Sequence, residues 1–95
     1  MQRLTLPNNS FLAFLDYERE TQTLYATIRK TGKQYLYKGF KLDDFNKLLG
    51  AQNKGSFFAL NINGKYECEF CCYVPLAEIE RALLPTKSFN KFLSK

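Results

Sequence analysis

Residues 29–41 read Arg-Lys-Thr-Gly-Lys-Gln-Tyr-Leu-Tyr-Lys-Gly-Phe-Lys, and the rest of the fold can be worked out from this stretch. It contains five cations, three aromatic residues and no acid. The pair Thr31 and Gly32 indicates a hairpin turn, which is followed by a strand that contains Tyr35 and Tyr37. Side chains two positions apart in a strand share a face, so both tyrosines should lie on one side of the sheet.

The length of the hairpin loop determines which side chains share that face. A two-residue loop of Thr31 and Gly32 needs positive φ at both positions, which a β-branched threonine resists. A three-residue loop over residues 30–32 needs positive φ only at the glycine, and we favour it. It pairs Tyr25 with Tyr37. The residues then predicted to share one face are Tyr25, Arg29, Lys33, Tyr35 and Tyr37.

Periodicity predicts the elements on either side of the hairpin. Alternating apolar residues indicate strands over residues 10–17 and 23–30. Residues 42–51 change to a helical period, and two acids fall in the first turn, where the helix dipole favours them. Residues 56–63 fit a helix or a strand equally well. Residues 65–74 alternate again and indicate a further strand.

A short final helix is expected over residues 76–84, because apolar residues recur there at helical spacing between Pro75 and Pro85. These elements predict an α+β fold: a three-stranded antiparallel meander, a packed helix, a further strand and a short C-terminal helix. The 95 residues are enough for one domain, residues 1–95, with a single core.

Composition narrows the class of protein. The apolar share is 45%, with nine Phe and six Tyr, which is typical of a globular chain with an aromatic core. The net charge of +5 favours phosphate, acidic protein surfaces or anionic lipid as partners, although a solvated basic surface would account for it equally well. No apolar run is long enough for a bilayer span or a signal peptide, so we expect a cytoplasmic protein without a membrane partner.

Three cysteines form the motif Cys68-x-x-Cys71-Cys72. A structural zinc site needs four ligands, and the chain has three Cys and no His. Strand alternation also places Cys68 and Cys72 on the face opposite Cys71. We therefore expect buried apolar thiols, no metal and no cofactor, with a cluster between molecules as the alternative.

Catalytic residues are poorly represented. No histidine is available as a general base, and no nucleophile elbow or phosphate-cradling loop occurs. Asp43 and Asp44 are adjacent, but neighbouring helical side chains point about 100° apart. We expect that the protein is not an enzyme.

The basic, aromatic hairpin is the best candidate site. Exposed rings on a sheet give bases a stacking surface, and flanking cations neutralise phosphates. The alternative is that these tyrosines are half-buried core residues. The candidate nucleic-acid-binding residues are Tyr25, Arg29, Lys30, Lys33, Tyr35, Tyr37, Lys38 and Lys41.

Four stretches of the chain resemble the KTSC domain, a short module of small bacterial and phage proteins and of some lysyl-tRNA synthetase C-termini. Residues 9–18 resemble its opening Ser-Ser-x-Ile and Gly-Tyr-Asp patterns, and residues 35–39 resemble its Tyr-x-Tyr. Residues 51–58 resemble its Ala-x-Ser-x-Gly segment, with Ile62 and Tyr66 following at the expected spacing. Asn9 and Asn53 stand where the patterns have serine. The resemblance covers about residues 9–66 and leaves 67–95 as an addition.

The resemblance implies RNA binding and carries over no catalytic residue. Our first hypothesis is therefore non-enzymatic binding of nucleic acid, with RNA or single strands favoured. The second is a phage-type or accessory protein that binds another protein through the added strand and an apolar tail of Phe89, Phe92 and Leu93. The third is that the basic aromatic face sequesters a small nucleotide.

Overall fold

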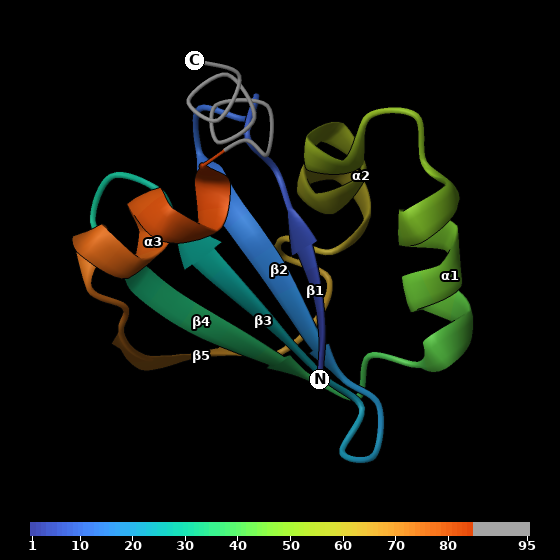
Figure 1. Ribbon diagram of the computed structural model, residues 1–95. Coiled ribbons are helices and arrows are strands. Elements are labelled where there is room, and N and C mark those ends of the chain that lie inside the picture. Colours follow the sequence, from blue (N-terminus) through green and yellow to red (C-terminus); the bar gives the residue numbers. More distant parts are fainter. Residues whose placement is uncertain (85–95) are drawn as a thin grey trace.

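The computed structural model describes residues 1–84 as a five-stranded antiparallel sheet with three helices (Figure 1). The strands lie side by side in chain order, so the sheet is one continuous meander. The predicted α+β class is confirmed; the structure adds a first strand and a second helix. The elements are β1 Gln2–Thr5, β2 Leu12–Glu18, β3 Thr23–Ile28, β4 Lys33–Lys38, α1 Leu42–Gly50, α2 Lys54–Asn61, β5 Cys68–Tyr73 and α3 Leu76–Leu83.

The helices cover both faces of the sheet (Figure 1). α1 and α2 pack on one face, which we call the α1/α2 face, and enclose the larger core. α3 packs on the opposite face, the α3 face, where Ile79 contacts Phe14 and Ala13 of β2. Both faces of β2 are therefore buried, as its largely apolar sequence predicts.

Tyr17 fixes α1 and the segment before it onto the sheet. Its ring stacks on Phe45 of α1 with the ring centroids 4.4 Å apart. Its hydroxyl donates a hydrogen bond of 2.6 Å to the carbonyl oxygen of Phe40. Phe40 also lies edge-on to Tyr17. Aromatic packing and a buried hydrogen bond thus act at one residue to hold β2 and α1 together.

The register of the β3–β4 hairpin differs from the predicted one. The loop has four residues, 29–32, and the amide of Gly32 donates to the carbonyl of Ile28 at 2.9 Å. Tyr37 consequently pairs with Leu24 instead of Tyr25. Adding one residue to a hairpin loop turns the next strand over. The predicted shared face is therefore wrong: Tyr35 and Tyr37 lie on the α1/α2 face, and Tyr25 lies on the α3 face.

The ambiguous residues 56–63 lie mostly in α2, which ends at Asn61. The helix begins after Asn53, whose side-chain oxygen accepts a hydrogen bond of 3.0 Å from the amide of Ser56. This is an N-cap, which satisfies an amide that has no partner within the helix.

β5 contains a bulge at Cys71. Phe70 pairs with Tyr35, and Cys72 pairs with Gln34. Tyr35 and Gln34 are consecutive in β4, so Cys71 is an extra residue of β5 that has no pairing partner in β4. All residues of β5 are exposed. The expectation that the cysteines are buried is therefore wrong, because β5 is an outer strand that no helix covers at these positions.

None of the helices within residues 1–84 is long and apolar enough to cross a bilayer. The predicted apolar tail of Phe89, Phe92 and Leu93 lies outside the described residues.

Burial raises the pKa of three tyrosines, Tyr17, Tyr37 and Tyr66. A tyrosine whose pKa is higher in the folded state than its unfolded value of about 10 stabilises the fold fully below that pH. This stabilisation is lost as the pH rises through the folded pKa. We therefore expect the free energy of unfolding to fall steeply above about pH 10, measured by urea unfolding across that range.

Tyr37→Phe provides the control for this pH dependence. Removing the hydroxyl removes one of the raised pKa values, so the alkaline loss of stability should be smaller than in the wild type. Equal losses in the two proteins would contradict the role assigned to Tyr37.

Candidate nucleic-acid interface

Three aromatic side chains, one half-buried and two exposed, lie in a row on the α1/α2 face, next to the outer edge of the sheet. We call Tyr35, Phe70 and Tyr73 the aromatic strip. The ring centroids of Tyr35 and Phe70 are 5.9 Å apart, and those of Phe70 and Tyr73 are 5.2 Å apart. Phe70 is 48% exposed and Tyr73 is 64% exposed. Such a cluster offers aromatic surface to a ligand without any change in the fold.

The bulge in β5 creates the aromatic strip. In a regular strand Phe70 and Tyr73, three positions apart, would point to opposite faces. The extra residue Cys71 restores Tyr73 to the side of Phe70, because Phe70 pairs with Tyr35 and Tyr73 pairs with Lys33. The sequence-based alternation missed both residues for this reason. The signal in the sequence that could have indicated Phe70 and Tyr73 is the concentration of apolar residues on both faces of this last strand, CEFCCY.

Charge is distributed unequally between the two faces of this edge. Lys33 lies opposite Tyr73 on the side of the strip. The acid Glu69 lies on the α3 face, where it pairs with Lys38 at 2.8 Å. The hydrogen bond to Glu69 raises the pKa of Lys38. The strip is therefore next to the cation Lys33, and the neighbouring acid is turned away from it.

A second ion pair further reduces the free positive charge of the α3 face. Arg3 binds Asp16 through two hydrogen bonds, of 2.7 and 3.0 Å, and its guanidinium lies 3.9 Å from the centre of the Phe14 ring. A guanidinium held in this way is already paired with an anion. The α3 face is thus less suited to phosphate than the side of the strip.

The structure separates the predicted site residues. Tyr35 and Lys33 lie at the strip, whereas Lys30 lines a cavity against α3. Tyr37 is only 5% exposed, and its ring packs edge-on against Phe58 of α2, with the centroids 5.6 Å apart. Tyr25 lies on the α3 face. Of the three predicted stacking residues, Tyr35 alone belongs to the strip, where it is half-buried.

The remaining predicted cations have other surroundings. Lys38 is the ion-paired residue of the α3 face, and Lys41 is exposed at the N-cap of α1. Arg29 donates hydrogen bonds to the carbonyl oxygens of Asn9 at 2.8 Å and of Leu6 at 2.7 Å, with a third to Pro7. Arg29 thus fastens the β3–β4 loop to the segment between β1 and β2.

Replacing Arg29 with lysine is expected to reduce the free energy of unfolding by about 1–3 kcal/mol, because one ammonium group cannot reproduce these contacts. Urea unfolding measures the effect. Lys30→Gln is the matched control, since Lys30 is the exposed neighbour of Arg29, and it should leave stability nearly unchanged. Equal stabilities for the two variants would contradict the structural role of Arg29.

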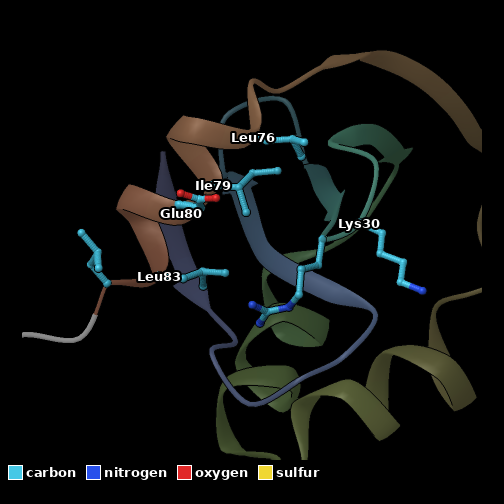
Figure 2. Close-up of a pocket in the computed structure, with 7 residues that line it drawn as sticks. Lys30, Leu76, Ile79, Glu80 and Leu83 are labelled. Carbon is cyan, nitrogen blue, oxygen red and sulfur yellow. The ribbon is translucent and has the colours of Figure 1, made fainter.

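A separate cavity of about 460 Å³ lies between the β3–β4 loop and α3. Its lining combines Arg29 and Lys30 with Leu76, Ile79 and Glu80 of α3. Figure 2 shows Leu76 and Ile79 directed from α3 toward the loop that carries Lys30. Apolar side chains and an acid thus face the two cations, which favours apolar contact over phosphate binding.

The KTSC-like segments meet in a polar pocket of about 330 Å³. Asn9 accepts hydrogen bonds from the amides of Phe11 and Leu12 at 2.8 and 2.7 Å. Gly55 lies so close to Asn9 that a Cβ there would overlap the amide nitrogen of the Asn9 side chain. Asn53, which caps α2, lines the same pocket. These motif positions therefore join the start of β2 to the start of α2, and the packing itself accounts for their residue types.

Comparison with known proteins agrees with this arrangement. The KTSC domain model matches residues 8–66. The crystal structure of a KTSC domain protein from Yersinia pestis is similar, with a TM-score of 0.65 and 27% sequence identity. That match covers 75% of this chain and 97% of the other. A search of the curated proteins found no match.

Proposed function

The chain belongs to the KTSC domain family, and we propose that it is a non-enzymatic nucleic-acid-binding module that holds RNA or single strands on the aromatic strip. In this proposal Tyr35, Phe70 and Tyr73 contact bases, and Lys33 contacts phosphate. Tyr37 supports the strip from the core. Arg29 holds the loop that carries Lys30.

The observation that carries the proposal is a row of aromatic rings, of which Phe70 and Tyr73 are exposed, beside Lys33, which has no ion-pair partner among residues 1–84. Base stacking on a protein ring contributes about 1–3 kcal/mol per base and needs little sequence preference. Lysine side chains beside the rings add electrostatic attraction to the phosphate backbone of the nucleic acid. The rings that would make the stacking contribution lie on the α1/α2 face of β4 and β5, next to Lys33.

Single strands fit this surface better than a duplex. In a duplex the faces of the bases are stacked on one another, so only edges and backbone are available to a protein. Phe70 and Tyr73 offer ring surface, which needs an unstacked base as its partner. We therefore expect labelled single-stranded RNA to bind more tightly than a hairpin duplex of the same length.

Salt dependence tests the phosphate contacts. Binding of labelled single-stranded RNA, followed by fluorescence anisotropy, should weaken as salt rises, because each phosphate contact releases counterions. Lys33→Gln should lower the slope of log K against log salt by about one. Lys41→Gln is the control, since Lys41 is an exposed lysine at the start of α1, and it should keep the wild-type slope. Salt-independent binding, or equal slopes for both variants, would contradict the proposal.

A second candidate function is favoured by the exposed outer edge of β5. The outer edge of β5 has no partner strand among residues 1–84, and its backbone groups can pair with an extended segment of another protein. Such binding rests on backbone hydrogen bonds and would depend only weakly on salt. The salt titration therefore separates the two candidates.

A further inference from the structure

The cavity between the β3–β4 loop and α3, which we call the α3 cavity, has an aliphatic wall and a basic wall. Leu76, Ile79 and Leu83 form the aliphatic wall, and their spacing places them on one side of α3. The loop residues Arg29 and Lys30 form the basic wall (Figure 2). The volume of about 460 Å³ falls within the range of roughly 300–1,000 Å³ that is typical of small-molecule sites.

The aliphatic wall keeps surface that the fold itself does not bury. Ile79 is buried because it also packs on Phe14 of β2, but Leu76 and the adjoining Leu84 are each more than half exposed. Exposed leucines scattered singly are ordinary, whereas leucines that line one hollow offer a ligand a continuous apolar contact. An aliphatic chain in the α3 cavity would remove this surface from water, which favours binding.

Arg29 has one nitrogen left for a ligand. Its Nε and Nη2 atoms donate to the carbonyl oxygens of Asn9, Leu6 and Pro7, and its Nη1 atom has no hydrogen-bond partner among residues 1–84. No fully buried side-chain nitrogen or oxygen within these residues lacks a partner, so the Nη1 atom is open to solvent. The carbonyl contacts hold the guanidinium in place, so its two remaining N–H groups can bind a ligand with little further loss of side-chain freedom.

Lys30 adds a second free cation to the same wall. Lys30 is exposed and has no ion-pair partner among the described residues. The lining also contains Glu80, which is likewise unpaired within residues 1–84, so it does not neutralise Arg29 or Lys30 by direct contact. Two cations and one acid leave one positive charge in excess, which complements a ligand with a single negative charge.

We propose that the α3 cavity binds an aliphatic monocarboxylate, namely a free medium-chain fatty acid. The carboxylate accepts hydrogen bonds from the Nη1 atom of Arg29 and from the ammonium group of Lys30, and the chain lies against the aliphatic wall. Charge-assisted hydrogen bonds of this kind are among the strong ones. A phosphate monoester carries close to two negative charges and would be repelled by Glu80, so a carboxylate fits the lining better.

This site is independent of the aromatic strip. None of the residues that line the α3 cavity belongs to the strip, and Lys33, the cation of the strip, is not part of the lining. Binding of the fatty acid can therefore be measured without nucleic acid, and its failure would leave the proposed function untouched.

Isothermal titration calorimetry with octanoate tests the proposal on the full-length chain. Octanoate is used below the concentration at which it forms micelles, so that the ligand is the free molecule. We expect saturable binding of one octanoate per chain. Octanol has the same aliphatic chain without the charge, and it should bind at least about tenfold more weakly, because the hydrogen bonds to a charged group are lost.

Two substitutions at exposed positions test the two walls separately. Lys30→Gln should weaken octanoate binding by about fivefold or more and leave octanol binding unchanged. Leu76→Glu should abolish octanoate binding, because it places a second acid in the lining. Lys41→Gln and Leu60→Glu are the matched controls, since they replace an exposed lysine before α1 and an exposed leucine of α2, and both should bind octanoate as the wild type does.

Circular dichroism checks that each variant is folded, which we expect because all four positions are exposed. Equal affinities for octanoate and octanol would overturn the role of the basic wall. Unchanged octanoate binding in Lys30→Gln or in Leu76→Glu would place the ligand elsewhere and overturn the proposal. So would the absence of saturable octanoate binding, or tighter binding of octylammonium, which would make Glu80 the group that recognises the ligand.

Discussion

Replacing Gly32 with alanine is expected to lower the free energy of unfolding by about 2–4 kcal/mol. Gly32 has φ +76°, a conformation that costs other residues about 1 kcal/mol or more. A Cβ at this position would also overlap the carbonyl oxygen of Val74. The amide of Val74 donates to the carbonyl of Gly32 at 2.7 Å, so the overlap falls on the contact between the β3–β4 loop and the end of β5.

Gly39→Ala separates the two causes of this loss. Gly39 also has positive φ, at +73°, but nothing lies within 4 Å of a Cβ built there. Its substitution should therefore cost only the conformational strain, about 1 kcal/mol. Urea unfolding of both variants gives the comparison. Equal losses of unfolding free energy in the two variants would show that overlap with the Val74 carbonyl oxygen does not destabilise Gly32→Ala.

The second large effect is expected on binding. Replacing Phe70 and Tyr73 with alanine should each weaken single-stranded RNA binding by about 1–3 kcal/mol, or roughly 5- to 150-fold. Both rings are largely exposed, so their removal leaves the core intact. The double variant should bind more weakly than either single one, measured by anisotropy at low salt.

Phe11→Ala is the control for this loss. Phe11 is an exposed aromatic residue that precedes β2 and lies outside the strip. Its removal should leave RNA binding unchanged. If Phe11→Ala weakened binding as much as Phe70→Ala, the effect would come from general surface hydrophobicity, and the strip would lose its assigned role.

Periodicity predicted most elements of this fold, but it missed β1 and left residues 56–63 open between helix and strand. The apolar stripe that includes Phe45 and Leu48 predicted α1, and the alternation around Leu24 and Ala26 predicted β3. The segments that resemble the KTSC domain were also found from the sequence, and the family match at residues 8–66 confirms them. Patterns of this kind can be predicted because they repeat over many residues.

Features that depend on one residue were not predicted. The hairpin loop differs by a single residue from the favoured one, and this moved Tyr35 and Tyr37 to the face opposite Tyr25. In the observed register Tyr35 and Tyr37 share a face with Leu24 and Ala26. Burial of the apolar area of these side chains therefore favours the observed register over the predicted one.

The bulge at Cys71 has the largest consequences for the candidate site. It brings Phe70 and Tyr73 to one face of the sheet. The alternating sequence of β5 contains no glycine or proline that marks a bulge. Its position therefore follows from pairing with β4, which sequence periodicity does not describe.

The most direct test of the central claim is to map the contact surface of a short single-stranded RNA on the wild-type protein by ¹H–¹⁵N and aromatic ¹H–¹³C NMR. We expect shift changes to concentrate on Lys33, Tyr35, Phe70 and Tyr73. Changes confined to the α3 face, around Tyr25 and Lys38, would contradict it, as would the absence of any change at low salt.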